Sequence, residues 1–246
     1  MALKAAPEDQ ALLLDLQALD TKLQQLARRA EKLPEREAVE SLTTQRAALE
    51  RTRGEQFGLV EDARLELKRT EADVEVVQAR MTRDSERLAG SSSVKDVQAL
   101  EQELAALAKR RSDLEDIELA VMETLEEREA VLAATDAELA TLATAIDEAV
   151  AARDAALAEI EAERTHAAAN RSTVAGKVPS ELLALYEKQR ERYGVGASHL
   201  RGGVTSASGV TLNATDMNVI RSAAPDDVIL CPDSSAILVR TAESGL

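Results

Sequence analysis

The sequence is poor in aromatic residues and in cysteine. Its aromatic rings, histidine aside, belong to Phe57, Tyr186 and Tyr193, and it has no tryptophan. A large globular core normally uses aromatic rings for bulk, so we expect an elongated protein with a thin core of leucine, valine and alanine. Cys231 is the single cysteine, which excludes an intrachain disulfide and a four-thiolate metal site within one chain.

Long apolar runs and a net positive charge are also absent. No apolar run approaches the ~20 residues of a membrane span, and Glu8, Asp9 and Asp15 interrupt the segment in which a signal peptide would lie. The formal net charge is −15, and residues 1–175 contribute −14 of it. Such an acidic chain repels phosphate backbones at long range. We therefore expect a soluble, cytoplasmic protein without a membrane partner, whose charged partners are basic.

The sequence does contain a long apolar heptad pattern. Between Val97 and Ile160, apolar residues recur in alternating steps of three and four, interrupted by single polar positions such as Arg111. This period of 3.5 residues predicts a coiled-coil seam that requires a partner helix. The same spacing recurs over residues 12–26 and 60–88, so the chain itself can supply that partner.

Breaks in the heptad pattern divide it into three helices. Pro34 interrupts the first helix, and Gly90–Ser93 forms a tight connection before the longest one. A short loop between long helices makes them antiparallel, and the first two helices together match the third in length. We predict an intramolecular coiled-coil hairpin over residues 1–178, with helices at 8–33, 35–89 and 94–175. The protein is then a monomer or weak dimer; parallel dimerisation through the long helix is the alternative.

Two glycines weaken the middle of the second predicted helix. Gly54 and Gly58 each cost a helix ~1 kcal/mol relative to alanine. Residues 51–58 are therefore expected to be a frayed or bent part of the coiled coil, and a functional hinge is the alternative interpretation.

Residues 179–246 are predicted to form a small α+β module. An amphipathic helix over Ser180–Arg192 precedes a segment rich in glycine and serine, in which Val204–Leu212 is expected to form a hairpin. Asn213 has the character of a helix cap, and β-branched runs at 228–230 and 237–239 flank a turn. Because a module of this size is marginally stable alone, it usually needs a metal, a disulfide or docking to a neighbour.

The most specific stretch of the chain is its tail, LNATDMNVIRSAAPDDVILCPDSSAILVRTAESGL, which follows a predicted hairpin with the apex segment SSVKDVQALEQEL. In these features the chain resembles the bacterial four-cysteine zinc-ribbon family with an amino-terminal coiled-coil hairpin. The resemblance implies a ribbon fold and a role in binding nucleic acids or proteins. It places the family's two Cys-x-x-Cys ligand pairs on Thr205 and Ser208 and on Cys231 and Ser234. Because neutral hydroxyls are poor replacements for thiolates, we expect no metal and no other cofactor.

Two groups of residues are candidates for contacts with a partner. The first is the set of arginines in the C-terminal part: Arg190, Arg192, Arg201, Arg221 and Arg240. These arginines could meet phosphates, but only Tyr186 and Tyr193 are available to stack on bases, so structural salt pairing is the alternative. The second group is the hairpin apex: Ser91, Ser92, Ser93 and Lys95.

Signs of catalysis are absent from the sequence. It shows no arrangement of a nucleophile with a base and an orienting group, and no phosphate-binding glycine loop. His199 lies in the same module as Cys231, but two ligands without a third in suitable spacing do not make a metal site. We therefore predict a non-enzymatic interaction protein, a coiled-coil rod that presents a metal-free ribbon-like module to a protein partner. The alternative is RNA or DNA binding through the arginines of that module.

Overall fold

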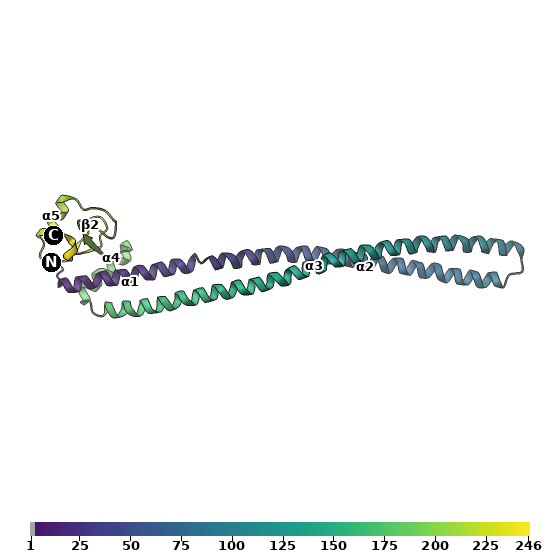
Figure 1. The fold of residues 1–246 in the computed structure, drawn as a ribbon, viewed down its shortest axis with the longest axis horizontal. Coiled ribbons are helices and arrows are strands. Elements are labelled where there is room, and N and C mark those ends of the chain that lie inside the picture. Colours follow the sequence, from purple (N-terminus) through teal and green to yellow (C-terminus); the bar gives the residue numbers. More distant parts are fainter. Residues whose placement is uncertain (1–2) are drawn as a thin grey trace. The chain divides into compact units, whose positions relative to one another are not determined.

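The computed structural model describes residues 3–246. The chain is mainly helical, with a long helical hairpin and a small C-terminal sheet (Figure 1). The three long helices are α1 (Pro7–Glu31), α2 (Pro34–Ala89) and α3 (Val94–Ala175). The shorter elements are α4 (Ser180–Tyr193), β1 (Ala197–Arg201), β2 (Val204–Thr205), α5 (Ala214–Ser222), β3 (Ile229–Leu230), β4 (Ile237–Val239) and the 3-10 helix η1 (Ala242–Ser244).

The contacts within the chain divide it into two compact units. One unit comprises Glu35–Ala151, and the other combines the residues up to Pro34 with Ala152–Leu246. None of the helices within residues 3–246 has an apolar stretch long enough to cross a membrane.

The unit of residues 35–151 is an antiparallel pair of helices, α2 and the first part of α3. Its seam buries apolar residues at the heptad positions of both helices, among them Val60 and Ala63 of α2 and Leu114 and Val121 of α3. Polar contacts between the helices flank this seam: an Nη of Arg64 lies 2.6 Å from a carboxylate oxygen of Glu129, and Arg53 pairs with Asp136. The predicted intramolecular hairpin is therefore confirmed. Helix α2 is continuous through Gly54 and Gly58.

In the other unit, α1 packs along the last part of α3. Leu26, Leu33 and Ile160 form a small buried cluster between these segments. The ammonium group of Lys22 lies 3.3 Å from a carboxylate oxygen of Glu163 at the exposed edge of this contact. Pro34 stands at the first position of α2, where its missing N–H costs no hydrogen bond, so it separates α1 from α2.

The same unit contains a four-stranded sheet in the order β2-β1-β4-β3. β1 is antiparallel to β2 and parallel to β4, with Ala197 opposite Ile237, and β3 is antiparallel to β4. One face of the sheet packs on α1 and α4 through a cluster that includes Leu13, Leu16 and Tyr186. The other face packs on α5 through Met217 and Ile220. The sheet is thus covered by helices on both faces.

The hairpin predicted over Val204–Leu212 forms as a short antiparallel pairing closed by the turn at residues 205–210. A second hairpin, which was not predicted, joins β1 to β2 around Gly202 and Gly203. Both of these glycines have positive φ, +54° and +79°, which the turn requires and which glycine adopts without steric cost. In the predicted hairpin, Val204 is bridged to Thr211, and the backbone N of Leu212 donates to the carbonyl oxygen of Gly203 at 2.9 Å.

Candidate interaction surface of the C-terminal module

The C-terminal module is anchored to the long helices by a buried carboxylate, Asp20 of α1. Its relative exposure is 4%. Its two oxygens accept hydrogen bonds from Arg171 of α3 at 2.6 and 3.1 Å, and one of them also accepts from the hydroxyl of Tyr186 in α4 at 2.7 Å. Arg190 of α4 approaches the same carboxylate at 3.6 Å. Helices α1, α3 and α4 therefore meet at one carboxylate. The hydrogen bonds and ion pairs that this carboxylate makes compensate the free-energy cost of burying its charge.

The neighbouring Gln17 ties α1 to the first strand. Its Oε1 accepts hydrogen bonds from the backbone N of Gly196 at 2.7 Å and of Ala197 at 3.2 Å. The ring of Tyr186 lies so close to Gly196 that a Cβ added there would be 2.5 Å from a ring carbon. Glycine is therefore required at position 196, and the fully buried Tyr186 ring sets the entry of the chain into β1.

This cluster perturbs the acid–base properties of its members. Burial, together with the hydrogen bond to Asp20, raises the pKa of Tyr186 above its ordinary value of 10.0. The hydrogen bond to Asp20 also raises the pKa of Arg171, which stays charged. Partial burial alone would raise the pKa of Glu187, but hydrogen bonds from Arg171 and Arg190 lower it below its ordinary value. The perturbed groups therefore serve an ion-pair network and do not face a cavity for a substrate.

The segment after β2 forms a tight turn over residues 205–210. The backbone N of Gly209 donates to the carbonyl oxygen of Thr205 at 2.8 Å, and the N of Thr205 donates to that of Val210 at 3.1 Å. The hydroxyl oxygen of Ser208 accepts from the N of Val210 at 3.4 Å. Gly209 has a φ of +67°, so the turn uses a left-handed residue at its fifth position counted from Thr205.

Residues 231–236 form a second turn with the same three hydrogen bonds. The backbone N of Ser235 donates to the carbonyl oxygen of Cys231 at 2.9 Å, and the N of Cys231 donates to that of Ala236 at 2.8 Å. The hydroxyl oxygen of Ser234 accepts from the N of Ala236 at 3.4 Å. Ser235 has a φ of +58° and takes the place that Gly209 has in the first turn. The two residue pairs that the resemblance assigned as ligand positions thus occupy equivalent places in two matching turns.

The side chains at these four positions do not fit a zinc ion. The hydroxyl of Thr205 is fully buried and lies 3.0 Å from that of Ser198, and the thiol of Cys231 is buried in the apolar cluster against α5. Ser208 and Ser234 accept hydrogen bonds within their own turns. Zinc prefers thiolate and imidazole ligands, and a set of three neutral hydroxyls with one thiol does not supply them. Across residues 3–246 there is no group of three or more His, Cys, Asp or Glu side chains arranged to hold a metal.

The arginines predicted to contact a partner are mostly engaged within the protein. Arg240 donates to five backbone carbonyl oxygens of the segment 220–227, including those of Ala224 at 2.7 Å and Asp227 at 2.8 Å. Arg190 pairs with Glu187 at 2.8 Å. At the exposed surface, Arg201 pairs with Glu243 at 2.6 Å.

The two other arginines are exposed and have no ion-pair partner within residues 3–246. The guanidinium of Arg192 lies over the ring of Tyr193, 5.3 Å from its centroid. Arg221 lies at the end of α5. The five arginines therefore do not converge on one continuous basic surface, because two of them are structural and a third is neutralised.

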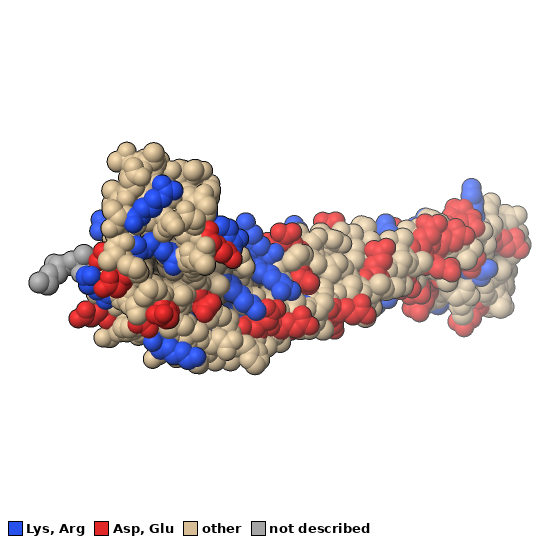
Figure 2. Space-filling view, turned by 60° about the vertical axis from the view of Figure 1, so that its left-hand side comes forward, with Lys and Arg blue, Asp and Glu red and all other residues tan. Residues whose placement is uncertain are grey.

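Apolar side chains, in contrast, are exposed on several elements of the module. Val204 of β2 is 36% exposed and Val210, at the end of the first turn, is 49% exposed. Val219 of α5 is 61% exposed. Leu230 and Leu246 add to them. Figure 2 shows the lobe at the upper left as largely uncharged surface with a few basic side chains. This surface offers more to an apolar partner than to a phosphate backbone.

The apex loop carries no such combination of features. Ser92, Ser93 and Lys95 are exposed and Ser91 is half-buried, with its backbone N donating to the carbonyl oxygen of Leu88 at 3.2 Å.

His199 of the module donates to or accepts from the hydroxyl of Thr241 at 2.8 Å, which gives this imidazole a structural partner.

Comparisons with known proteins find both sequence and structural relatives. A family model described as the CT398-like coiled coil hairpin domain matches residues 16–194. Two proteins of Mycobacterium tuberculosis, the uncharacterized proteins Rv2229c and MT2288, are each 33% identical over 239 residues, which are 97% of this chain and 98% of theirs.

Solved structures show the same likeness. A protein from Mycobacterium smegmatis superposes with a TM-score of 0.88 at 33% identity, over 97% of this chain and 100% of the other. CT398 from Chlamydia trachomatis superposes with a TM-score of 0.65 at 18% identity, over 94% of this chain and 97% of the other, and this likeness concerns the fold alone.

Proposed function

The chain belongs to the family of the CT398-like coiled coil hairpin domain, and from this premise we propose that it is a non-enzymatic interaction protein that binds a protein partner through its C-terminal module. One observation carries the proposal: the module exposes Val204, Val210 and Val219 while its arginines Arg190, Arg201 and Arg240 are bonded internally. Exposed apolar groups lose unfavourable contact with water when a partner covers them.

The proposal includes a ribbon-like module that holds its shape without metal. The matching turns at 205–210 and 231–236 support the ribbon-like description. Backbone bonds close both turns, and the buried Ser198–Thr205 hydroxyl pair and the apolar cluster around Cys231 supply cohesion where the resembling family would use zinc. The anchor at Asp20 adds the docking to a neighbour that a module of this size requires.

We further propose that the protein works in the cytoplasm as a monomer or weak dimer. The net charge of −15 favours repulsion between copies, and the heptad seam over residues 60–121 is closed within the chain. No catalytic role is proposed, because the perturbed titratable groups around Asp20 are paired with one another.

Affinity capture from the native host tests this function. The tagged full chain is compared with a Val204→Asp, Val210→Asp double variant, and with Val76→Asp as a matched control, since Val76 is an exposed apolar residue of α2 with 66% exposure. We expect a protein that co-purifies with the wild type and the control but is lost, at least tenfold, from the double variant. Equal recovery with all three chains contradicts a role for the module surface.

RNA or DNA binding is the competing outcome, and it has its own signature. Retention of nucleic acid would fall steeply with salt and would be lost on Arg201→Glu or Arg221→Glu, because phosphate contacts release counterions. We expect no retention by the wild type even at low salt. If the wild type retains nucleic acid in a salt-sensitive way and these substitutions abolish the retention, the partner is a nucleic acid and not a protein.

A further inference from the structure

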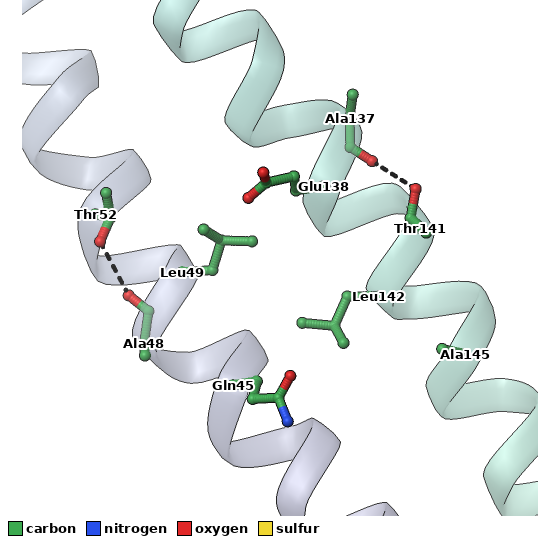
Figure 3. A pocket seen from close by; sticks show the side chains of 9 residues that line it. All are labelled: Gln45, Ala48, Leu49, Thr52, Ala137, Glu138, Thr141, Leu142 and Ala145. Carbon is green, nitrogen blue, oxygen red and sulfur yellow. Dashed lines mark hydrogen bonds between the residues drawn. The ribbon is translucent and has the colours of Figure 1, made fainter.

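An apolar groove lies between α2 and α3 in the hairpin unit, far along the chain from the C-terminal module. It has a volume of about 700 Å³ and is lined by Gln45, Ala48, Leu49, Thr52, Ala137, Glu138, Thr141, Leu142 and Ala145. Figure 3 shows Leu49 and Leu142 pointing toward each other from the two helices. The hydroxyls of Thr52 and Thr141, which also line the groove, donate to carbonyl oxygens of their own helices, so both hydroxyls already have hydrogen-bond partners.

The seam of the hairpin is open at this groove. No side chain of α2 from Pro34 to Leu59 is buried, whereas Val60 and Ala63, immediately beyond, are 1% exposed. Leu49 and Leu142 occupy heptad positions but stay partly exposed, because the alanines beside them are too small to cover them. A third helix lying against the small residues would bury these leucines, as helices do in grooves that recognise amphipathic partners.

The groove continues along one face of the hairpin. On α2, Gln45, Leu49, Thr52, Gln56 and Leu59 follow steps of four and three, and the last two line a second hollow of about 230 Å³ with Arg128 and Val131. Residues at this spacing share one face of a helix. From Gln45 to Leu59 the face extends over ~21 Å, which is the length of about four helical turns.

The charges on the two sides of the groove differ. Between Glu123 and Glu148, α3 carries eight carboxylates and one basic side chain. Within residues 3–246, only Glu129 and Asp136 of these carboxylates have an ion-pair partner. Between Gln45 and Leu59, α2 carries three arginines and two glutamates. Of the unpaired carboxylates, Glu138 lines the groove and Glu127 lines the second hollow. An occupant with basic residues along the edge facing α3 would therefore meet these two carboxylates, and a second copy of this acidic chain would meet like charge.

We infer that this groove binds an amphipathic helix of a partner protein, with an apolar stripe over Leu49 and Leu142 and a lysine- or arginine-rich edge against the α3 carboxylates. The inference rests on the proposed function only in treating the chain as an interaction protein. It concerns a different surface, so Val210→Asp in the module leaves it unchanged.

A labelled synthetic peptide tests the inference by fluorescence anisotropy. The probe is an 18-residue helical peptide with leucines at heptad positions, lysines along one flank and glutamines along the other. Two controls are a peptide of the same composition with its leucine stripe scrambled and a peptide with glutamates in place of the lysines. We expect the full chain to bind the probe at least tenfold more tightly than either control peptide.

Variants of the full chain locate the binding site. Ala145→Trp fills the groove without removing a seam leucine, and Glu138→Lys reverses the charge on its α3 side; each should weaken probe binding at least tenfold. Glu101→Lys, an exposed carboxylate elsewhere on α3, is the matched control and should leave binding unchanged. Circular dichroism checks that every variant stays helical.

Three outcomes overturn the inference. Equal binding of the probe and the scrambled peptide, or binding that Ala145→Trp does not weaken, shows a general attraction of the peptide to the acidic chain and no binding site in the groove. A dimer in sedimentation that Ala145→Trp dissociates shows that a second copy occupies the groove. None of these results bears on the proposed role of the module surface, because only the capture experiment with Val204→Asp and Val210→Asp tests that surface.

Discussion

Asp20 is the residue at which the helices of the module-bearing unit are joined. Its carboxylate accepts hydrogen bonds from Arg171 and Tyr186, which lie 151 and 166 positions further along the chain. No local pattern in the sequence marks these residues as partners, since each is an ordinary polar position in its own helix. Only the antiparallel return of α3 along α1 brings them together, so residue-level reasoning on the sequence missed this anchor.

The first prediction concerns the strength of that anchor. Asp20→Ala removes the acceptor of a partly buried arginine and a buried phenol, so we expect a loss of about 3–5 kcal/mol in the free energy of unfolding. Glu163→Ala is the matched control, because Glu163 pairs with Lys22 and Arg29 at an exposed edge, and should cost under about 1 kcal/mol. Urea unfolding followed by tyrosine fluorescence measures both. Similar losses for the two variants would contradict the assigned role of Asp20.

The second prediction concerns the pH dependence of the same anchor. The pKa of Tyr186 in the folded protein lies above its ordinary value of 10.0. The neutral phenol therefore contributes its full stabilisation below pH 10, and the contribution declines as the pH rises above 10, by about 1.4 kcal/mol per pH unit. Tyr186→Phe should remove this decline. The measurement is the difference in unfolding free energy between wild type and variant from pH 9 to pH 11; a difference that does not vary with pH refutes the assignment.

At the scale of elements, the helices followed from the sequence more completely than the strands. The heptad spacing, Pro34 and the Gly90–Ser93 connection predicted the hairpin, because each acts through local backbone chemistry. β1, with the sequence ASHLR, has little β-branched character and was not expected; it is a strand because β4 and Gln17 supply partners for its backbone. The structural use of Arg240 likewise depends on the position of the segment 220–227 in space.

Helix α2 provides the third prediction. Gly54 and Gly58 have no atom within 4 Å of an added Cβ, so Gly54→Ala and Gly58→Ala should each stabilise the protein by ~0.5–1 kcal/mol. Gly209→Ala, with a φ of +67°, should have the opposite sign. Thermal unfolding compares the three variants. If Gly54→Ala stabilises the helix yet weakens partner binding, residues 51–58 act as the hinge that the sequence left open.

The fourth prediction concerns the two matching turns of the module. Protein purified without added metal should contain no stoichiometric zinc, and a chelator should not shift its melting temperature, because the donors present are one thiol and three hydroxyls. A variant with Thr205→Cys, Ser208→Cys and Ser234→Cys should gain about one zinc per chain together with Cys231. Elemental analysis measures both. About one zinc per wild-type chain would refute the metal-free description.

At the scale of the whole molecule, charge and apolar exposure indicate which partners the chain accepts. The net charge of −15 disfavours nucleic acid, and the arginines that could have offset it locally are largely bonded within the module. The sequence alone left protein and nucleic acid as alternatives, because the number of arginines does not show how they are used. Their hydrogen-bond partners are the reason that we propose a protein partner.

Site-specific photo-cross-linking in the native host tests the central claim most directly. A photoreactive amino acid replaces Val210 of the module, and a second chain carries it at the exposed Ala168 of α3 as a control. We predict a light-dependent adduct from position 210, absent from position 168, that protease digests and nuclease does not. An adduct that nuclease removes, or no adduct above that of the control position, would contradict the proposal that this module binds a protein.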